Sequence, residues 1–388
     1  MKKVNKCVTA IAFCSTIAIG GLQAPSVSYA DSTTSVSEMQ PDTQKLSDFR
    51  KELKKHIDNH EENITITYNT NEKNGEEVLN KLYQEYNNLL AKDEYEYVKP
   101  NVAKVQWGLE GMPGQYMFKL NITYRESKEQ TQFVKAQAKS IINSIVKPGM
   151  DQHEKVKAIH DYIVKHVSYD TSYKAYTAYE ALANRSAVCQ GYALLTYQLL
   201  TEAGIQAHYV TGKGNGGPHA WNLVKIENKW YHLDTTFDDP VPDKAGRVMY
   251  SYFNVTDEQL SKDHEWDRSK YPTATTSYFN ELTNKIKAGS SKTVVYKQML
   301  KETNLMYLSA EYGVENYNQL KQKLQQHFTA KPEKVELRYK KSMNETMQDI
   351  KMVLNETSWP QGAKKVSYHV APYNAMEGYS LATITFTY

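Results

Sequence analysis

Alternating apolar and polar positions near both ends of the chain predict two small α+β segments with the same element order. In the first segment we expect helices over 49–60 and 76–91 and strands over 64–68, 102–107 and 116–124. In the second segment we expect helices over 317–328 and 344–354 and strands over 335–339, 365–370 and 382–388. We interpret the two segments as related modules that flank a central domain. The alternative is that short amphipathic elements resemble each other by chance.

The central region shows helical patterns first and strand patterns afterwards. Helices are expected over 128–146 and 152–167. A short helix is expected directly after Thr177, and a further one over 190–203 that ends at Gly204. Asp151 and Thr177 are N-cap candidates, since each has a glutamate three residues later. Strands are expected over 206–212, 219–226 and 230–236, and the glycine-rich stretch 214–218 predicts a mobile loop. This order of elements indicates an α+β fold.

The first thirty residues have the composition of a signal peptide. Three lysines precede an apolar stretch over 7–22, and Ser28 and Ala30 stand at the −3 and −1 positions of a cut before Asp31. We therefore expect an exported protein, secreted or held at the cell surface. No later run is long and apolar enough for a transmembrane anchor. The predicted division is 1–30 signal peptide, 31–45 flexible leader, 46–127 N-terminal module, 128–288 central domain and 289–388 C-terminal module.

Charge and cysteine content limit the range of possible functions. The formal charge of +3 falls to 0 when the three lysines of the signal peptide are removed, so the balance predicts no nucleic-acid partner. Cleavage of the signal peptide also removes two of the 3 cysteines, so that only Cys189 remains. An exported chain with a single thiol forms no internal disulfide, which indicates a reactive role for that thiol.

Cys189 stands at the start of a predicted helix. The unpaired N–H groups and the positive end of the helix dipole at this position favour thiolate over thiol. The alternative is that Cys189 is a small buried apolar side chain.

Two further residues complete a candidate constellation with Cys189. His219 and Asp234 lie on the two strands of a hairpin, which is closed by Glu227-Asn228-Lys229. An even number of loop residues places both side chains on one face of the sheet, and an odd number separates them. Cysteine, histidine and aspartate in this order indicate a triad in which the imidazole accepts the thiol proton and the carboxylate orients the ring.

Several competing assignments use the same region. His232 shares a strand face with Asp234 and is a second candidate for the imidazole. A zinc site of Cys189, His219 and Asp234 lacks the paired spacings of structural zinc, so we expect no metal or other cofactor. A calcium site from three aspartates has no EF-hand spacing, and we interpret these side chains as solvated loop acids: Asp238, Asp239 and Asp243.

Four motifs in this order resemble those of bacterial transglutaminase-like domains, which belong to the papain-like superfamily. They are Ala178-Tyr179-Glu180-Ala181-Leu182, Val188-Cys189-Gln190-Gly191-Tyr192-Ala193, His219-Ala220-Trp221-Asn222 and Trp230-Tyr231-His232-Leu233-Asp234-Thr235-Thr236. The resemblance covers roughly 151–267. It implies a papain-like core of helices and an antiparallel sheet, with Cys189 as nucleophile, His219 as base and Asp234 as the orienting carboxylate.

Two positions depart from the family pattern. Ala187 stands where many members have glycine. The tryptophan that assists the oxyanion in animal transglutaminases has no counterpart upstream of Cys189, and Tyr169 is the candidate to replace it, beside the backbone N–H of Cys189.

The expected function is that of an exported thiol enzyme. It attacks an amide carbonyl and forms a thioester, which passes to an amine or to water. One alternative is a cysteine peptidase or amidase that only hydrolyses; another is a non-catalytic adhesion or scaffold protein. The expected partner is a protein or peptide substrate, with cell-wall peptide as one candidate.

Overall fold

The computed structural model describes residues 42–239, 241–242 and 246–388 of the chain. The predicted signal peptide lies outside the described residues. The described chain forms two compact units, and the first consists of residues up to Val248 together with Tyr252–Thr275. The second consists of Met249–Ser251 and Thr276–Tyr388. The first unit holds the N-terminal module and the triad candidates together, and the finer division at 46–127, 128–288 and 289–388 stays a prediction.

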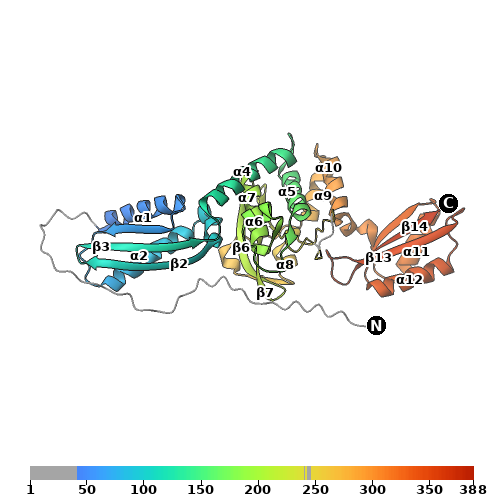
Figure 1. The fold of residues 1–388 in the computed structure, drawn as a ribbon. Helices are drawn as coiled ribbons and strands as arrows, with labels where there is room; N and C mark the ends of the chain where they lie inside the picture. Colours follow the sequence, from blue (N-terminus) through green and yellow to red (C-terminus); the bar gives the residue numbers. More distant parts are fainter. Residues whose placement is uncertain (1–41, 240, 243–245) are drawn as a thin grey trace. The chain divides into compact units, whose positions relative to one another are not determined.

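The N-terminal module is a three-stranded antiparallel sheet with helices on one face (Figure 1). Every second residue of β1 is buried, and the apolar faces of α1 and α2 join these residues in one core. Helix α1 begins at Asp42, earlier than the start at Phe49 that the sequence predicts. The elements are α1 (Asp42–Asp58), β1 (Asn63–Tyr68), α2 (Gly75–Leu90), η1 (Asp93–Tyr95), α3 (Val98–Asn101), β2 (Val102–Met112) and β3 (Gln115–Tyr124).

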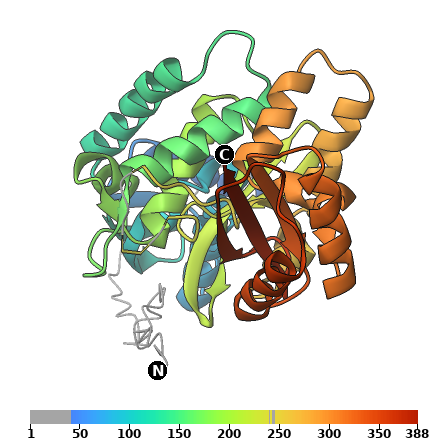
Figure 2. The same ribbon diagram turned by 90° about the vertical axis from the view of Figure 1, so that its right-hand side faces the viewer.

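The second unit contains a module with the same topology. Its strand order is β11-β12-β14-β13, so the first long strand pairs with the third, as in the N-terminal order β1-β3-β2. The predicted repeat of element order is therefore confirmed. Figure 2 shows this module in orange-red to dark red. The elements are α9 (Tyr278–Lys287), α10 (Thr293–Glu302), η3 (Leu305–Leu308), η4 (Ala310–Tyr312), β11 (Gly313–Val314), α11 (Tyr317–Phe328), β12 (Lys334–Tyr339), α12 (Met343–Glu356), β13 (Lys365–Pro372) and β14 (Ser380–Thr387).

The rest of the first unit combines helices with a five-stranded antiparallel sheet of order β10-β6-β7-β8-β9. The α+β fold class is confirmed. The short strands β9 and β10 have three residues each, too few for an alternating pattern in the sequence. The elements are α4 (Lys128–Ile145), α5 (Gln152–His166), β4 (Ser168–Tyr169), α6 (Ala178–Ala183), β5 (Ser186–Ala187), α7 (Cys189–Glu202), β6 (Ala207–Gly214), β7 (Gly217–Ile226), β8 (Lys229–Leu233), β9 (Phe253–Val255), α8 (Asp257–Leu260), β10 (His264–Trp266) and η2 (Arg268–Lys270).

Helix α7 is the centre of this core. It packs against α4, α5 and α6 on one side and against strands β6 and β7 on the other. Nine of its residues are buried, among them Thr196 and Gln198, which are polar. A helix that is covered on all sides cannot show a single apolar face, which explains its weak amphipathic pattern.

Local signals define the ends of the helices before and after this centre. Asp151 and Thr177 form the predicted capping boxes with Glu154 and Glu180. Gly204 has a φ of 74°, a left-handed conformation that glycine adopts without strain, so α7 ends where the sequence predicts.

The N-terminal module is joined to the core by hydrogen bonds from residues far apart in the sequence. Glu96 accepts from the ring of His208 at 2.6 Å and from the backbone N–H of Tyr209 at 2.8 Å. The amide of Gln190, next to Cys189, donates to the carbonyl of Pro100 at 2.9 Å. The module therefore contacts the segment that carries the thiol.

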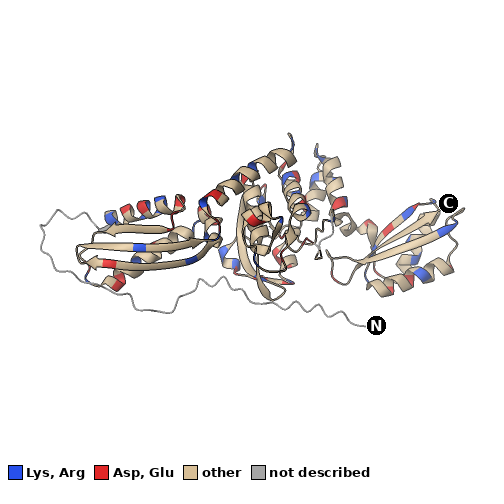
Figure 3. Ribbon diagram, viewed as in Figure 1, with Lys and Arg blue, Asp and Glu red and all other residues tan. Residues whose placement is uncertain are grey.

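Charged residues of both signs are interspersed on the helices, as Figure 3 shows for α1 and α12. Within the described part of the chain, every helix is too short or too polar to cross a membrane.

Gly191 provides a test of the packing around α7. A Cβ at this position lies 2.6 Å from Ala187 Cβ and 2.8 Å from the carbonyl oxygen of Thr177, so something must shift. We expect Gly191→Ala to lower the free energy of unfolding by about 1–3 kcal/mol, although alanine favours a helix. The control is Gly108→Ala, because a Cβ on Gly108 meets nothing within 4 Å. Urea unfolding of both variants checks this, and equal midpoints contradict it.

Candidate active site

Cys189 is the first residue of α7 and is partly exposed. The short parallel pair β4 and β5 leads the chain into this helix, with Tyr169 opposite Ala187. The backbone N–H groups of Gly191 and Tyr192 bond to the carbonyl of Val188 at 2.9 and 3.2 Å. The sulfur therefore stands at the N-terminus of a well-formed helix, as the sequence predicts.

His219 lies on β7 and is buried against a glycine. A Cβ on Gly214 would be 2.9 Å from both the His219 ring and the Phe237 ring, so only glycine leaves room for these rings. Gly214 pairs with Gly217 across a tight turn of Asn215 and Gly216. The predicted loop over 214–218 is shorter in the structure, because only Asn215 and Gly216 lie outside the paired strands, and its mobility stays a prediction.

The next hairpin brings Asp234 to His219. Residues 227 and 228 form a two-residue loop, since Ile226 pairs with Lys229. This even loop puts Asp234 on the face that carries His219, and His219 Nε2 lies 2.7 Å from Asp234 Oδ2. Asp234 is fully buried, and its Oδ1 accepts the backbone N–H groups of Thr236 at 2.9 Å and Phe237 at 3.1 Å.

The electrostatics of the pair favour charge on both partners. Burial alone would lower the pKa of His219, but the charge and hydrogen bond of Asp234, together with Cys189, raise it to about 10. Burial would raise the pKa of Asp234, and its two histidine neighbours hold it below its ordinary value instead. The two groups therefore form an ion pair at neutral pH.

Cys189 is also a neighbour of this ring, and together with Asp234 it raises the pKa of His219. Since Nε2 of His219 is engaged by Asp234, Nδ1 is the nitrogen left for the sulfur. The structure thus brings together the three residues that sequence reasoning selected.

His264 is a member of the cluster that sequence reasoning missed. Its Nε2 lies 3.1 Å from Asp234 Oδ2, and its Nδ1 lies 2.6 Å from Asp263 Oδ1. The Tyr252 hydroxyl donates to the other oxygen of Asp263 at 2.6 Å. Both ring nitrogens of His264 therefore face carboxylate oxygens. Strand β10 is too short to signal this position in the sequence.

A metal site is possible in principle at three of these residues. One ligand atom each from His219, Asp234 and His264 lies within 4.8 Å of the others. However, both Nε2 atoms already lie at hydrogen-bond distance from the same Asp234 oxygen. The donors and acceptors satisfy one another, and the expectation that the site uses no cofactor stays a prediction.

Asp238 and Asp239 are buried, so the interpretation of these two residues as solvated loop acids is wrong. Asp238 bonds to Nε2 of His160 at 3.1 Å, and Asp239 accepts the Tyr192 hydroxyl at 2.5 Å. Burial raises the pKa of Asp238 to about 6 against the opposing effect of His160. Asp243 lies outside the described residues. These contacts attach the segment after Asp234 to α5 and α7, which no spacing rule in the sequence signals.

His232, the competing ring, is engaged elsewhere. Its Nδ1 accepts from the indole of Trp221 at 3.0 Å, and its Nε2 lies 2.8 Å from Asp257. Burial lowers the pKa of His232 despite the Asp257 partner. His219 is the ring that contacts both Cys189 and Asp234.

Tyr169 lies near the thiol through the pairing of β4 with β5. Burial raises the pKa of Tyr169, and the proximity of Cys189 adds to the rise. The hydroxyl therefore keeps its proton and is available as a donor. Its role toward an oxyanion is untested.

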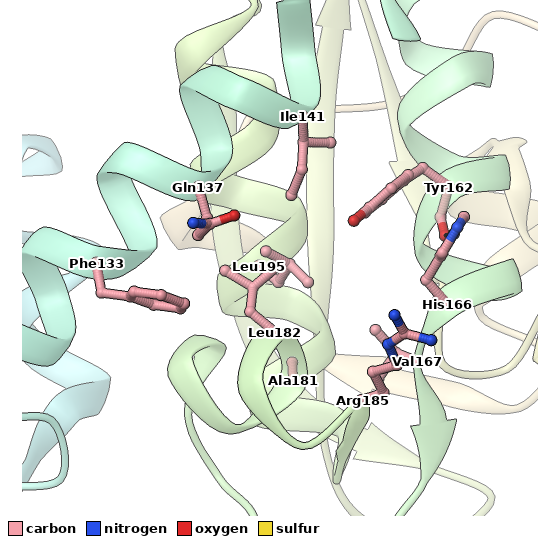
Figure 4. A pocket seen from close by; sticks show the side chains of 10 residues that line it. All are labelled: Phe133, Gln137, Ile141, Tyr162, His166, Val167, Ala181, Leu182, Arg185 and Leu195. Carbon is pink, nitrogen blue, oxygen red and sulfur yellow. Dashed lines mark hydrogen bonds between the residues drawn. The ribbon is translucent and has the colours of Figure 1, made fainter. Parts of the chain in front are cut away.

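A separate cavity of about 190 Å³ lies between α4, α5, α6 and α7, away from the triad candidates (Figure 4). Figure 4 shows the guanidinium of Arg185 and the hydroxyl of Tyr162 turned toward it. Its lining residues are Phe133, Gln137, Ile141, Tyr162, His166, Val167, Ala181, Leu182, Arg185 and Leu195.

Comparisons with known proteins show what this chain is similar to. Residues 139–235 match the family model of the transglutaminase-like superfamily. A curated relative, the kyphoscoliosis peptidase of Mus musculus, is 24% identical over 180 residues, which are 39% of this chain and 27% of that protein. The match thus spans about a quarter of the relative's length.

Two solved structures are also similar. One is a TGase with 19% identity and a TM-score of 0.27, over 35% of this chain and 44% of that one. The other is the periplasmic domain of TgpA from Pseudomonas aeruginosa, with 19% identity and a TM-score of 0.22, over 32% of this chain and 56% of that one. The family match includes Cys189, His219 and Asp234. Residues 139–235 thus carry a transglutaminase-like family match, which supports a thiol enzyme of this kind.

Proposed function

We propose that the protein is an exported thiol enzyme that attacks an amide carbonyl through Cys189, His219 and Asp234. The observation that carries the proposal is the position of His219, whose ring bonds to the buried Asp234 and has Cys189 as a neighbour that raises its pKa. A structural cysteine needs neither partner. The signal-peptide pattern supports export.

The chemistry follows from this chain of contacts. The Cys189 sulfur attacks the carbonyl carbon of a glutamine side chain or peptide bond, and the C–N bond breaks from the tetrahedral intermediate. His219 gives its proton to the leaving amine, while Asp234 holds the ring and stabilises its charge. The remaining thioester is attacked by a second amine or by water, and His219 removes the proton of the attacking molecule.

The oxyanion of the intermediate needs donors beside the sulfur. The N–H groups at a helix start have no acceptor within the helix, so the backbone N–H of Cys189 is one donor. Tyr169 is the second candidate, because its hydroxyl stays protonated near Cys189. Each such donor typically contributes about 10²–10³ in kcat.

The formation of a thioester and its further reaction distinguish three candidate functions. Transfer to an amine makes the protein a cross-linking transferase, and hydrolysis makes it a peptidase or amidase. A scaffold protein with an inert core forms no thioester. The buried ion pair of His219 and Asp234 argues against the scaffold, because a buried charged pair carries a desolvation penalty without adding clear stability.

Mass spectrometry of the intact protein tests the proposal. Incubation with glutamine-containing peptides and with cell-wall peptide should give a covalent adduct at Cys189 that hydroxylamine removes. Addition of a primary amine then separates transfer from hydrolysis through the products formed. Absence of any adduct with every peptide, together with unchanged turnover in Cys189→Ser, contradicts the proposal.

Substitution of each candidate histidine in turn tests which one acts as the base. We expect His219→Ala to lower kcat by at least about 10²–10⁴, because the base and the leaving-group acid are lost together. His232→Gln should keep most of the turnover, since this ring bonds to Trp221 and Asp257. Steady-state kinetics and circular dichroism of both variants check this. Equal loss in two folded variants means that the wrong ring has been assigned.

The charge on Asp234 predicts a pH dependence. The pKa of His219 is raised to about 10, so the imidazolium that protonates the leaving amine persists at neutral pH and is lost as pH rises through about 10. We expect kcat/KM to fall over that alkaline range. Asp234→Asn removes the charge that sustains the imidazolium and should move the fall to lower pH by more than about one unit. Profiles from pH 7 to 11 measure this, and an unmoved alkaline limb in Asp234→Asn refutes it.

A further inference from the structure

Arg125 is an arginine without an acidic partner close to the nucleophile. It follows strand β3 at the end of the N-terminal module, and its backbone N–H bonds to the carbonyl of Asn101 at 2.7 Å. Its side chain is half-buried, and its guanidinium carbon lies 4.9 Å from the centre of the Tyr176 ring. The backbone and the ring stack hold the side chain toward the core.

The guanidinium has unused hydrogen-bonding capacity. Its Nε is buried and has no hydrogen-bond partner, and among the described residues no carboxylate forms an ion pair with it. The adjacent Glu126 is committed elsewhere, to the hydroxyl of Tyr97 at 2.8 Å and the N–H of Tyr179 at 2.9 Å. By contrast, Arg50 forms a two-pronged bond with Glu85 at 2.6 and 2.8 Å. A buried donor without an acceptor requires an explanation.

The contacts of Tyr176 place Arg125 near the thiol. The carbonyl of Ala175, one residue before Tyr176, accepts the N–H of Val188 at 2.8 Å, and Val188 directly precedes Cys189. Arg125 and Cys189 both affect the pKa of the same two tyrosines. Burial raises the pKa of Tyr176 and of Tyr209; Cys189 adds to each rise and Arg125 opposes it. All three residues of this group are partly exposed: Cys189, Tyr176 and Arg125.

We propose that Arg125 binds a carboxylate of the acyl-donor substrate beside the amide that Cys189 attacks. The planar guanidinium is suited to this group, because its parallel N–H donors match the two oxygens of a carboxylate. The carboxylate comes from an acidic side chain or from the free end of a short peptide. The inference rests on the proposed function of Cys189 and adds to it the charge of the substrate.

Alkylation of Cys189 in the full-length protein tests the inference without a known substrate. The probes are iodo acids of increasing chain length, beginning with iodoacetate and 3-iodopropionate, each compared with its matched neutral amide. In every case the sulfur forms an S–C bond and iodide leaves with the bonding electrons. We expect the acid-to-amide rate ratio to fall about tenfold in Arg125→Gln for at least one chain length, because a charged hydrogen bond has been removed.

Two further variants serve as controls. Arg125→Lys keeps the charge and loses the paired donors, so its ratios should lie between those of the wild type and Arg125→Gln. Arg268→Gln should leave all ratios unchanged, although Arg268 also stacks on an aromatic ring, at 4.6 Å from Trp266. Ratios unaffected by Arg125→Gln at every chain length overturn the inference. An equal fall in the rates of acids and amides also overturns it, because the effect is then on the thiol itself.

Peptide pairs identify the source of the carboxylate. One pair carries glutamate or glutamine next to the reactive glutamine, and the other ends in a free acid or an amide. The wild type should prefer the acid of one pair through a lower KM, and Arg125→Gln should lose that preference. Absence of any Arg125-dependent preference in both pairs overturns the inference. If the proposed function fails instead, no peptide is turned over, while the alkylation ratios still report on Arg125.

Discussion

The carboxylate of Asp234 is the interaction on which the site depends. One of its oxygens lies at hydrogen-bond distance from two histidine rings, on β7 and β10. The other oxygen accepts hydrogen bonds from two backbone N–H groups of the turn that follows β8. A buried carboxylate with four donors has little freedom to rotate or to lose its charge. The sheet order β10-β6-β7-β8-β9 serves this arrangement, because it brings strands far apart in the sequence to one carboxylate.

Much of the fold follows from patterns that a single segment contains. Capping boxes at Asp151 and Thr177, alternation in β1 and the glycine after α7 are local, so their elements were predicted close to their observed bounds. The three triad candidates were predicted because a helix start and a hairpin define their positions. The even loop that unites His219 and Asp234 was left open by the sequence, since one residue more or less reverses the face.

What the sequence did not reveal depends on contacts between distant segments. His264 and the buried pair of Asp238 and His160 are fixed by tertiary packing, and an acidic residue in a loop has no signal for burial. The close approach of the His219 ring to Gly214 was missed for a related reason. Glycine marks both flexible turns and close approaches, and only the neighbouring rings show which applies to Gly214.

The joint between the N-terminal module and the core has a consequence for the order of synthesis. Glu96 must find His208, which is 112 residues further along the chain, and Gln190 must find Pro100, which is 90 residues back. A nascent chain can close the local hydrogen bonds of its first sheet early, because β1, β2 and β3 are complete by Tyr124. The contact between Glu96 and His208 can form only after β6 has left the ribosome. The surroundings of the thiol are therefore completed only after the sheet of the N-terminal module has been synthesised.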